Sequence, residues 1–434
     1  MRTIVNGRAA AFDNLMLAAA LLAVAGSHAA ELDGQEAAPA SVPSTSAAAE
    51  PSDSADTGLA KCPAADDSLP CKIRRADARW RYELAGHGPL AIVWQGLLMV
   101  DLAAPNSVLI EDNNVQVRRF RIGFDRRIEE WTLRGYAEYK TGGLELEELY
   151  LKHSLWGGQF VIGNQTEPFG LERITGVAST TQLERALPAA LTPGLDMGAV
   201  YARRDGNWYW TAGLFAAGSP NDGLRNKGQA VDTRLVWADV DDGHVRHFGA
   251  ALSFRPQSSD SEIRFRSTPE IGVSNVYLVD TGKFADVDQV RRAGVECAEV
   301  VGAWSWQAES MTMWLSRANG LPDLAFHASY AELSWFPWEG RRRYDAEQAR
   351  FGTIGDVGDA TVQFSARISH IDLSSRDVDG GRETNVTLAA NWYLTERARL
   401  GANLVKVIQL DGGPFQGTAQ GDYAFIVRLQ YDFL

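Results

Sequence analysis

The clearest pattern in this chain is an alternation of apolar and polar residues near its C-terminus. From Tyr423 to Phe433 every odd position is apolar or aromatic, and most even positions are polar. Between Ala360 and His370 the phase is reversed, with the apolar residues at even positions. Because successive side chains of a strand point to opposite faces, each segment predicts a strand with one apolar and one polar face.

Similar segments recur from about residue 80 to the end of the chain, separated alternately by short turns and longer loops. The approximate cores of sixteen candidate strands are 90–103, 115–124, 130–140, 145–155, 158–166, 198–204, 207–217, 228–239, 245–255, 289–301, 304–317, 327–337, 360–371, 384–394, 397–409 and 421–433. A soluble sandwich would also alternate, but with shorter strands. The pattern therefore predicts an all-β fold: a sixteen-stranded antiparallel transmembrane β-barrel over 80–434, with a polar lumen and both termini on the periplasmic side.

Three connections are much longer than the others, at about 167–197, 256–288 and 338–359. Long loops without secondary structure are uncommon in compact folds and are usually functional. Sixteen strands would otherwise leave an open aqueous pore. We therefore predict constriction loops that fold inward and narrow the channel.

The N-terminus predicts export. Arg2 and Arg8 precede a short apolar stretch and the small residues of a cleavage site, so residues 1–29 are typical of a signal peptide and too short on apolar residues for a membrane anchor. Residues 30–79 lack periodic apolar positions and predict a disordered linker and N-terminal periplasmic segment. No later stretch approaches eighteen apolar residues, so no transmembrane helix is expected.

Three cysteines are present, in a compartment that permits disulfides. Cys62 and Cys71 are close in sequence, and a short structural disulfide between them is expected. Cys297 lies at an apolar position of a strand pattern and predicts a small buried or lipid-facing side chain.

The chain's charge and motifs exclude several functions. A net charge of -13 argues against nucleic acid as a partner. There is no phosphate-cradling glycine loop and no zinc-like His/Cys cluster, so we expect no enzyme, no cofactor and no metal. His244 and His247 have no third ligand nearby, and His153 and His370 fit interfacial positions better than the catalytic site of a phospholipase.

Six motifs follow one another along the chain: Ile162–Glu172 (IGNQTEPFGLE), Glu184–Pro188, Asp241–Gly243, Val279–Gly282, Tyr344–Ala346 and Asn391–Leu394. In this order they resemble the phosphate-selective porin O/P family, and the resemblance covers about residues 85–434. The resemblance implies an outer-membrane homotrimer in contact with lipid and lipopolysaccharide, passing small anions such as phosphate or pyrophosphate. It also implies that two extracellular loops and one periplasmic segment narrow each pore. Thr166 stands where family members often carry lysine, which predicts weaker phosphate binding.

Strand parity assigns lumen-facing charges, because arginine facing lipid at mid-depth would cost roughly 2–4 kcal/mol. The candidate pore-lining residues of the anion pathway are Arg119, Arg121, Arg134, Arg234 and Arg367 by parity, Arg185 from the first long loop, and Glu148 by resemblance. The same parity places Arg255, Arg292, Arg399 and Arg428 inside the barrel. Alternatively, these arginines pair with lumenal acids such as Glu138, Glu296 and Glu309 and only stiffen the barrel.

The chain has thirty-five arginines against seven lysines, and guanidinium groups suit phosphate and carboxylate oxygens. Many acidic residues fall in the linker and the outer loops, where salt screens them. The sequence therefore predicts a passive, anion-preferring diffusion channel. The alternative is a structural or adhesin-like outer-membrane barrel with a plugged or non-selective lumen.

Overall fold

The computed structural model describes three residues near the N-terminus and most of the chain from residue 92 onward. The described residues are 68, 71, 73, 92–103, 108–110, 114–140, 143–222, 228–257, 262–284, 286–354, 360–415 and 417–433. The chain divides into two compact units, Met1–Ala78 and Arg79–Leu434. In the first unit Cys71 is disulfide-bonded. Cys62, its predicted partner, lies outside the described residues, as do the predicted signal peptide and almost all of the predicted linker.

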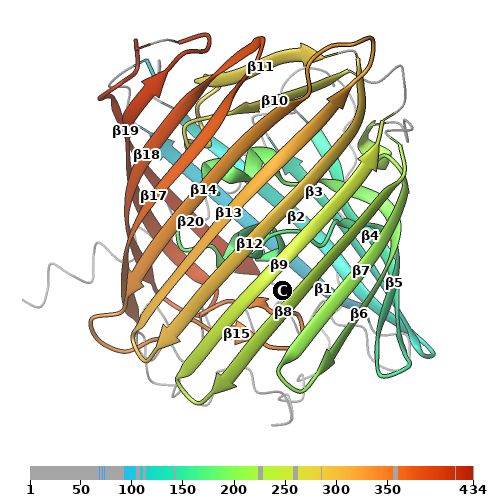
Figure 1. Ribbon diagram of the computed structural model, residues 1–434. Coiled ribbons are helices and arrows are strands. Elements are labelled where there is room, and N and C mark those ends of the chain that lie inside the picture. The colour runs from blue at the N-terminus through green and yellow to red at the C-terminus, as the bar shows by residue number, and fades with distance from the viewer. Residues whose placement is uncertain are drawn as a thin grey trace, which may run out of the picture. The chain divides into compact units, whose positions relative to one another are not determined.

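Sixteen strands of the second unit form a closed antiparallel barrel, in which β20 pairs with β1 (Figure 1). In barrel order they are β1 (Ile92–Ala103), β2 (Asn114–Ile128), β3 (Trp131–Lys140), β4 (Gly143–Leu155), β5 (Gly158–Thr166), β6 (Leu195–Asp205), β7 (Trp208–Ala217), β8 (Ala230–Asp241), β9 (His244–Pro256), β12 (Val287–Val301), β13 (Trp304–Arg317), β14 (Leu324–Trp335), β17 (Thr361–Ser375), β18 (Val378–Tyr393), β19 (Ala398–Asp411) and β20 (Tyr423–Phe433). Each predicted strand core matches one of them, so the predicted fold is confirmed.

Side chains alternate between the two faces of the wall as the sequence predicts. On β13, Trp304 and Trp306 are exposed on the outside, whereas Ser305 and Gln307 are buried inside the barrel. Exposed tryptophans gather at strand ends next to the short turns, as in the aromatic girdle of a membrane barrel. They include Trp208, Trp210, Trp304, Trp306, Trp335 and Trp392. Among the described residues no helix is both long and apolar enough to cross a membrane.

Two β-bulges interrupt the alternation where consecutive charged residues occur. The register of β1 with β2 shifts at Arg118, and that of β3 with β4 shifts at Glu147, so each of these residues is the extra one in its strand. As a result Arg118 and Arg119 both point inward, and so do Glu147 and Glu148, while the apolar residues on either side stay outside. The bulges concentrate charge on the lumenal face of β2 and β4.

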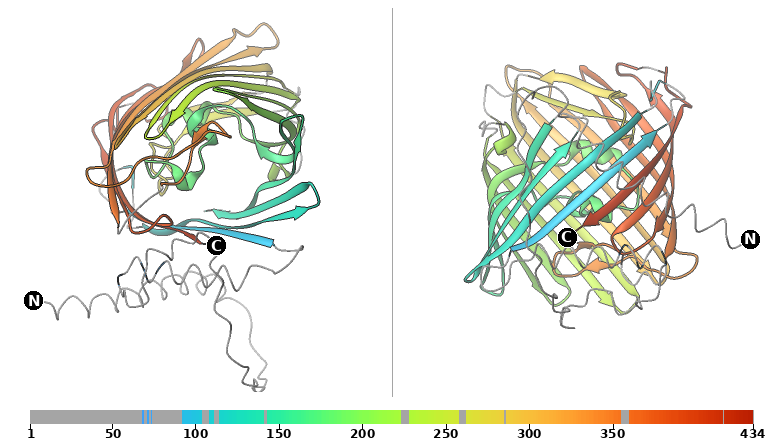
Figure 2. Two further views of the ribbon diagram at one scale, coloured as in Figure 1. Left: turned by 90° about the horizontal axis from the view of Figure 1, so that it is seen from below. Right: turned by 180° about the vertical axis from the view of Figure 1, so that it is seen from behind.

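The three long connections carry structure of their own, contrary to the expectation of structureless loops. The β5–β6 loop (167–194) contains α3 (Leu171–Ile174) and the 3-10 turns η2 (Val177–Ser179) and η3 (Leu187–Leu191). Its helical turns lie inside the ring of strands in the end-on view (Figure 2). The β9–β12 connection forms the hairpin of β10 (Ile263–Ser267) and β11 (Val279–Phe284), and the β14–β17 connection forms the short hairpin of β15 (Tyr344–Asp345) and β16 (Arg350–Phe351).

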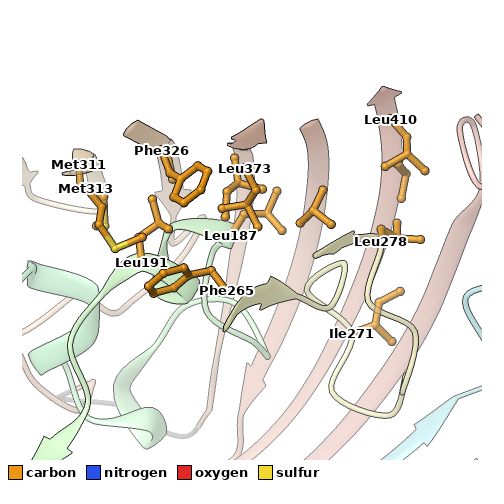
Figure 3. Packing of buried hydrophobic residues seen from close by; sticks show 14 of the residues in the cluster. Leu187, Leu191, Phe265, Ile271, Leu278, Met311, Met313, Phe326, Leu373 and Leu410 are labelled. Carbon is orange, nitrogen blue, oxygen red and sulfur yellow. The ribbon is translucent and has the colours of Figure 1, made fainter. Parts of the chain in front are cut away.

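The lumen contains an apolar core near the end of the barrel that carries β10 and β11. Leu187 and Leu191 of η3 face Met311 and Met313 of β13, and Phe265 of β10 packs against Phe326 of β14 (Figure 3). At this end the inward residues of the wall are therefore apolar, whereas the sequence predicted a polar lumenal face throughout. Burial of these side chains stabilises the inward position of the loops, because the hydrophobic free energy is roughly proportional to the apolar area removed from water.

The barrel closes where β20 meets β1, and one aromatic residue marks the closure. Phe433 lies opposite Gly96, and a Cβ atom at Gly96 would come within 2.2 Å of the Phe433 ring. The ring also stacks on Phe120 and on Tyr431, each with a centroid distance of 6.1 Å. Glycine at position 96 thus leaves the space that this ring occupies.

We expect Phe433→Ala to reduce insertion into the membrane and to lower the stability of the folded barrel by roughly 1–3 kcal/mol, because the seam loses its ring stacking and apolar contact. Samples are heated to a series of temperatures and then run on a cold detergent gel. The measurement is the heating temperature at which the band of the folded protein disappears. Phe425→Ala is the matched control, since Phe425 is on the same strand and is exposed outside. Equal effects of the two changes would contradict a special role for the seam.

Candidate functional site

A cavity of about 530 Å³ in the lumen lies against one side of the barrel. Its wall is formed by β2–β8, and its other boundary by the β5–β6 loop and by residues 347–350 of the β14–β17 connection. Of the described residues that line it, nine are cationic and three are acidic. The cations are Arg119, Arg121, Arg134, Lys140, Lys152, Arg173, Arg185, Arg234 and Arg350, and the acids are Glu147, Glu148 and Glu347. The cavity lining is therefore strongly cationic.

The arginines of β2 and β3 that line the cavity each have an acidic partner behind them. Arg119 and Arg121 both pair with Glu138, whose side chain is completely buried in the wall. Arg134 donates from Nε to Asp125 at 2.6 Å, and its guanidinium lies over the ring of Tyr150 at 5.8 Å. These partners fix the guanidinium groups at the cavity surface and offset part of their charge.

Two arginines of the β5–β6 loop add charge of a different kind. Arg185 donates hydrogen bonds to the carbonyl oxygens of Glu172, Arg173 and Thr175 at 3.0–3.2 Å, which are neutral acceptors. The Nε atom of Arg173 is buried and has no hydrogen-bond partner. Burial and the positive charge of Arg173 lower the pKa of Arg185 to about 10, and Arg119 acts in the same direction. Three guanidinium groups thus repel one another at this point of the cavity.

The other inward arginines hold the β5–β6 loop against the opposite wall. Each reaches the loop from a different strand, and most bond to its backbone. Arg255 pairs with Glu167 at 2.9 Å, Arg292 donates to the carbonyl of Leu191 at 2.8 Å, Arg367 to that of Glu184 at 3.0 Å, Arg399 to that of Thr180 at 2.7 Å, and Arg428 to that of Leu183. These five residues, the latch arginines, fasten the loop from β9, β12, β17, β19 and β20.

Glu184 joins this loop to the closure of the barrel. Its carboxylate accepts from Arg118 at 2.8 Å and from Arg428 at 2.6 Å, and Arg428 also binds the buried Asp101 of β1. Burial alone would raise the pKa of Glu184, but the two guanidinium groups outweigh burial and hold its pKa well below the usual range. Glu184 is therefore ionised under all physiological conditions.

The start of the loop depends on two buried carboxyl groups. Glu309 of β13 accepts the backbone N–H groups of Leu171 and Glu172 at 2.8 and 2.7 Å, which are free donors at the start of α3. Glu172 in turn accepts the N–H of Ala186 and pairs with Arg367 at 3.1 Å. Burial, together with the nearby Glu332 carboxylate, raises the pKa of Glu172 to about 7 despite Arg367.

A family model described as "Phosphate-selective porin O and P" matches residues 100–433. The chain belongs to this family. A porin O of Pseudomonas aeruginosa is 25% identical over 303 residues, which cover 61% of this chain and 68% of that protein. An uncharacterized protein of Caulobacter vibrioides is 24% identical over 343 residues, 73% of this chain and 68% of that protein. The solved structure of the in-vitro folded outer membrane protein OmpT of Vibrio cholerae shares the fold, with a TM-score of 0.52 at 13% identity, covering 81% of this chain and 100% of that one.

The chain is therefore an outer-membrane porin that forms a channel. In this porin six of the seven residues selected from the sequence line the cavity, namely Arg119, Arg121, Arg134, Glu148, Arg185 and Arg234. Arg234 does so only at its edge, because it is buried and paired with Glu296. Arg367 is also inside the barrel, as parity required, but it does not line the cavity: the β5–β6 loop and Glu270 cover it.

Several cavity residues were not selected from the sequence. Arg173 lies in the single turn of α3 and Arg350 in the two-residue strand β16, and both elements are too short for alternation to indicate which way a side chain points. Lys140 and Lys152 lie on β3 and β4 with inward parity, so counting from their lipid-facing neighbours could have identified them. Among the described residues no group of three or more His, Cys, Asp or Glu side chains could hold a metal ion.

We expect Glu172→Gln to gain stability relative to the wild type as the pH rises. The folded pKa of about 7 lies above the unfolded value of 4.5, so the folded state holds the proton more tightly, and wild-type stability falls as the pH rises from 4.5 to 7. Gln has no proton to lose, and the difference between the two proteins should shift by roughly 1–3 kcal/mol across this window.

The measurement is thermal unfolding, followed by tryptophan fluorescence in detergent at pH 5 and pH 8. Glu262→Gln is the control, because Glu262 is exposed and its ion pair among the described residues is with Lys283 of the hairpin. If the stability difference between Glu172→Gln and wild type is the same at both pH values, Glu172 does not carry a raised pKa.

Proposed function

We propose that this porin is a passive channel that prefers anions, with the cavity along β2–β8 as its pathway. The observation that carries the proposal is the cluster of Arg119, Arg173 and Arg185, whose like charges converge on one part of the cavity. An anion entering the cluster would relieve the repulsion between these groups. Conduction needs sites that attract an ion without trapping it, and guanidinium groups spread along a wall suit this requirement.

The acidic residues of the chain do not cancel this preference. Glu138, Glu296 and Glu309 point into the barrel, but they are buried behind cationic or backbone partners and do not line the cavity. The three acids that do line it stand against nine cations. The proposal therefore rests on the charges in contact with the cavity and not on the net charge of -13.

Phosphate or pyrophosphate as the carried anion is proposed from family membership and from the relative named porin O. Thr166 lines the cavity where family members often carry lysine, so we propose weaker phosphate binding than is typical of the family. We also propose that the channel is a homotrimer, and that the end of the barrel that carries the β10–β11 hairpin faces the outside of the cell. Cross-linking of the detergent-solubilised protein tests the trimer, and a species that never exceeds one subunit would refute it.

We expect Arg173→Gln to lower the anion-to-cation permeability ratio by roughly threefold, because a unit charge several ångströms from a permeating ion is worth somewhat under 1 kcal/mol in water-like surroundings. The measurement is the reversal potential of a planar bilayer across a potassium chloride gradient. Arg264→Gln is the control, since Arg264 is half-exposed on the β10–β11 hairpin and pairs with Asp280 away from the cavity. A cation-selective sign in the wild type would refute the proposed function.

Glu138→Gln should change selectivity in the opposite direction. It removes the buried negative charge that offsets Arg119 and Arg121, so the permeability ratio should rise by a similar factor of about three. Replacing Arg119, Arg121 and Glu138 together by Gln should bring the ratio below that of the wild type. Replacing the two arginines alone would leave the buried carboxylate of Glu138 with Lys140 at 3.6 Å as its remaining ion pair among the described residues, and the triple change avoids this. A ratio that falls in Glu138→Gln would contradict the proposed arrangement.

A further inference from the structure

The cavity has a second wall of opposite character, which an anion channel for hydrated phosphate would not need. The apolar side chains that line it on β5 and β6 are Val161, Leu195, Val200 and Ala202, and the polar Gln159, Gln165 and Thr166 line it beside them. The cationic wall on β2–β4 and this apolar wall belong to the same cavity.

Strand register makes Val161, Val200 and Ala202 neighbours in the wall, where they form a short apolar strip beside the polar Gln159. Val161 of β5 lies directly opposite Val200 of β6, and Gln159 lies opposite Ala202. On the other side of β5, Val161 lies directly opposite Lys152 of β4. A lysine ammonium group therefore stands beside the start of an apolar strip, and all of these side chains line the cavity.

The β5–β6 loop completes the apolar surroundings from the opposite side of the cavity. Ile174 and Val177, on either side of the turn at Gly176, both line it. Arg350 donates to the carbonyl oxygen of Ile174 at 3.0 Å, and Arg185 donates to that of Thr175 at 3.0 Å, so this part of the loop is held in place. The apolar side chains are thus a fixed feature of the wall.

Lys152 differs in its partners from the other cations of β2–β4 that line the cavity. Lys140 pairs with Glu145 at 2.9 Å, and Arg134 pairs with Asp125. No ion pair of Lys152 occurs among the residues that the structure describes, and the residue is neither fully buried nor engaged in a described hydrogen bond. Its charge is therefore available to a solute at the edge of the apolar strip.

We infer that, in addition to the inorganic anions proposed above, the channel takes small organic anions with an apolar body, such as aromatic or branched aliphatic carboxylates, and binds them more tightly. The charged head would lie at Lys152 and the body along Val161 and Ala202, where it would remove apolar surface from water. A hydrated inorganic anion gains nothing from this strip. The inference rests on the proposed anion preference and adds to it a class of solute.

The test compares how benzoate, acetate and inorganic phosphate reduce the chloride current of the full-length porin in planar bilayers. Benzoate and acetate carry the same charge and differ in their apolar body. We expect benzoate to reach half-maximal block at about a tenfold lower concentration than acetate, given the apolar area of a ring. Phosphate should block no better than acetate.

Two variants locate the effect. In Val161→Thr/Ala202→Ser the advantage of benzoate over acetate should fall below about threefold, because the strip becomes polar at nearly constant volume. In Lys152→Gln both carboxylates should block more weakly by a similar factor, since the shared head group loses its partner. Val231→Thr, a valine exposed on the outer face of β8, is the matched control and should behave like the wild type.

The outcomes separate this inference from the proposed function. If the wild-type reversal potential is anion-selective but benzoate and acetate block equally, the class of solute is wrong and the anion channel stands. If the reversal potential is cation-selective, both fail. Should the double variant not insert, the wild-type comparison of benzoate with acetate still decides. If Lys152→Gln leaves the half-maximal blocking concentrations of both anions unchanged, the placement of the charged head at Lys152 is overturned.

Discussion

The feature on which the rest of this structure depends is the fastening of the β5–β6 loop by buried guanidinium groups. A barrel of sixteen strands is wide enough for an open aqueous channel, so something must fill part of it. The latch arginines supply charge-assisted hydrogen bonds to backbone carbonyl groups that would otherwise be buried without partners. Breaking one such contact would leave both a charge and a carbonyl unpaired, which makes the loop position well defined.

The fastening also makes the lumen asymmetric. The latch arginines come from β9 to β20, and the apolar core around Leu187, Leu191 and Phe265 lies on the same side, against β13 and β14. The cavity remains along β2–β8, where the arginines point into it and do not reach the loop backbone. Arginine thus has two roles in this barrel: from β9 to β20 it fastens the β5–β6 loop, and along β2–β8 it lines the cavity.

Local alternation was enough to predict the barrel, the approximate cores of its strands and the inward direction of the strand arginines selected by parity, such as Arg119 and Arg428. It could not predict which inward residues the loops cover, because the contact of Arg367 with Glu184 joins segments far apart in sequence. It also gave no direction for Arg173, which lies in a single helical turn. The bulges did leave a local signal: consecutive charges, such as Arg118 and Arg119, break an otherwise regular pattern. Near the loops the inward side chains of the wall are apolar, so the prediction of a polar lumenal face was wrong for that part of the barrel.

The contrast between an acidic chain and a cationic cavity follows from the depth at which each charge lies. A guanidinium group that touches a carboxylate, as Arg134 touches Asp125, acts on a distant ion as a dipole, and its field decays faster than that of a single charge. Arg173 and Lys152 have no such partner among the described residues, so their fields extend further into the cavity. In the proposed channel these two residues, more than the paired arginines of β2 and β3, would therefore set the sign of selectivity. For the same reason the net charge of a chain does not predict the ion selectivity of its pore. Buried acids that fasten loops add to the net charge but contribute little to the electric field at a permeating ion.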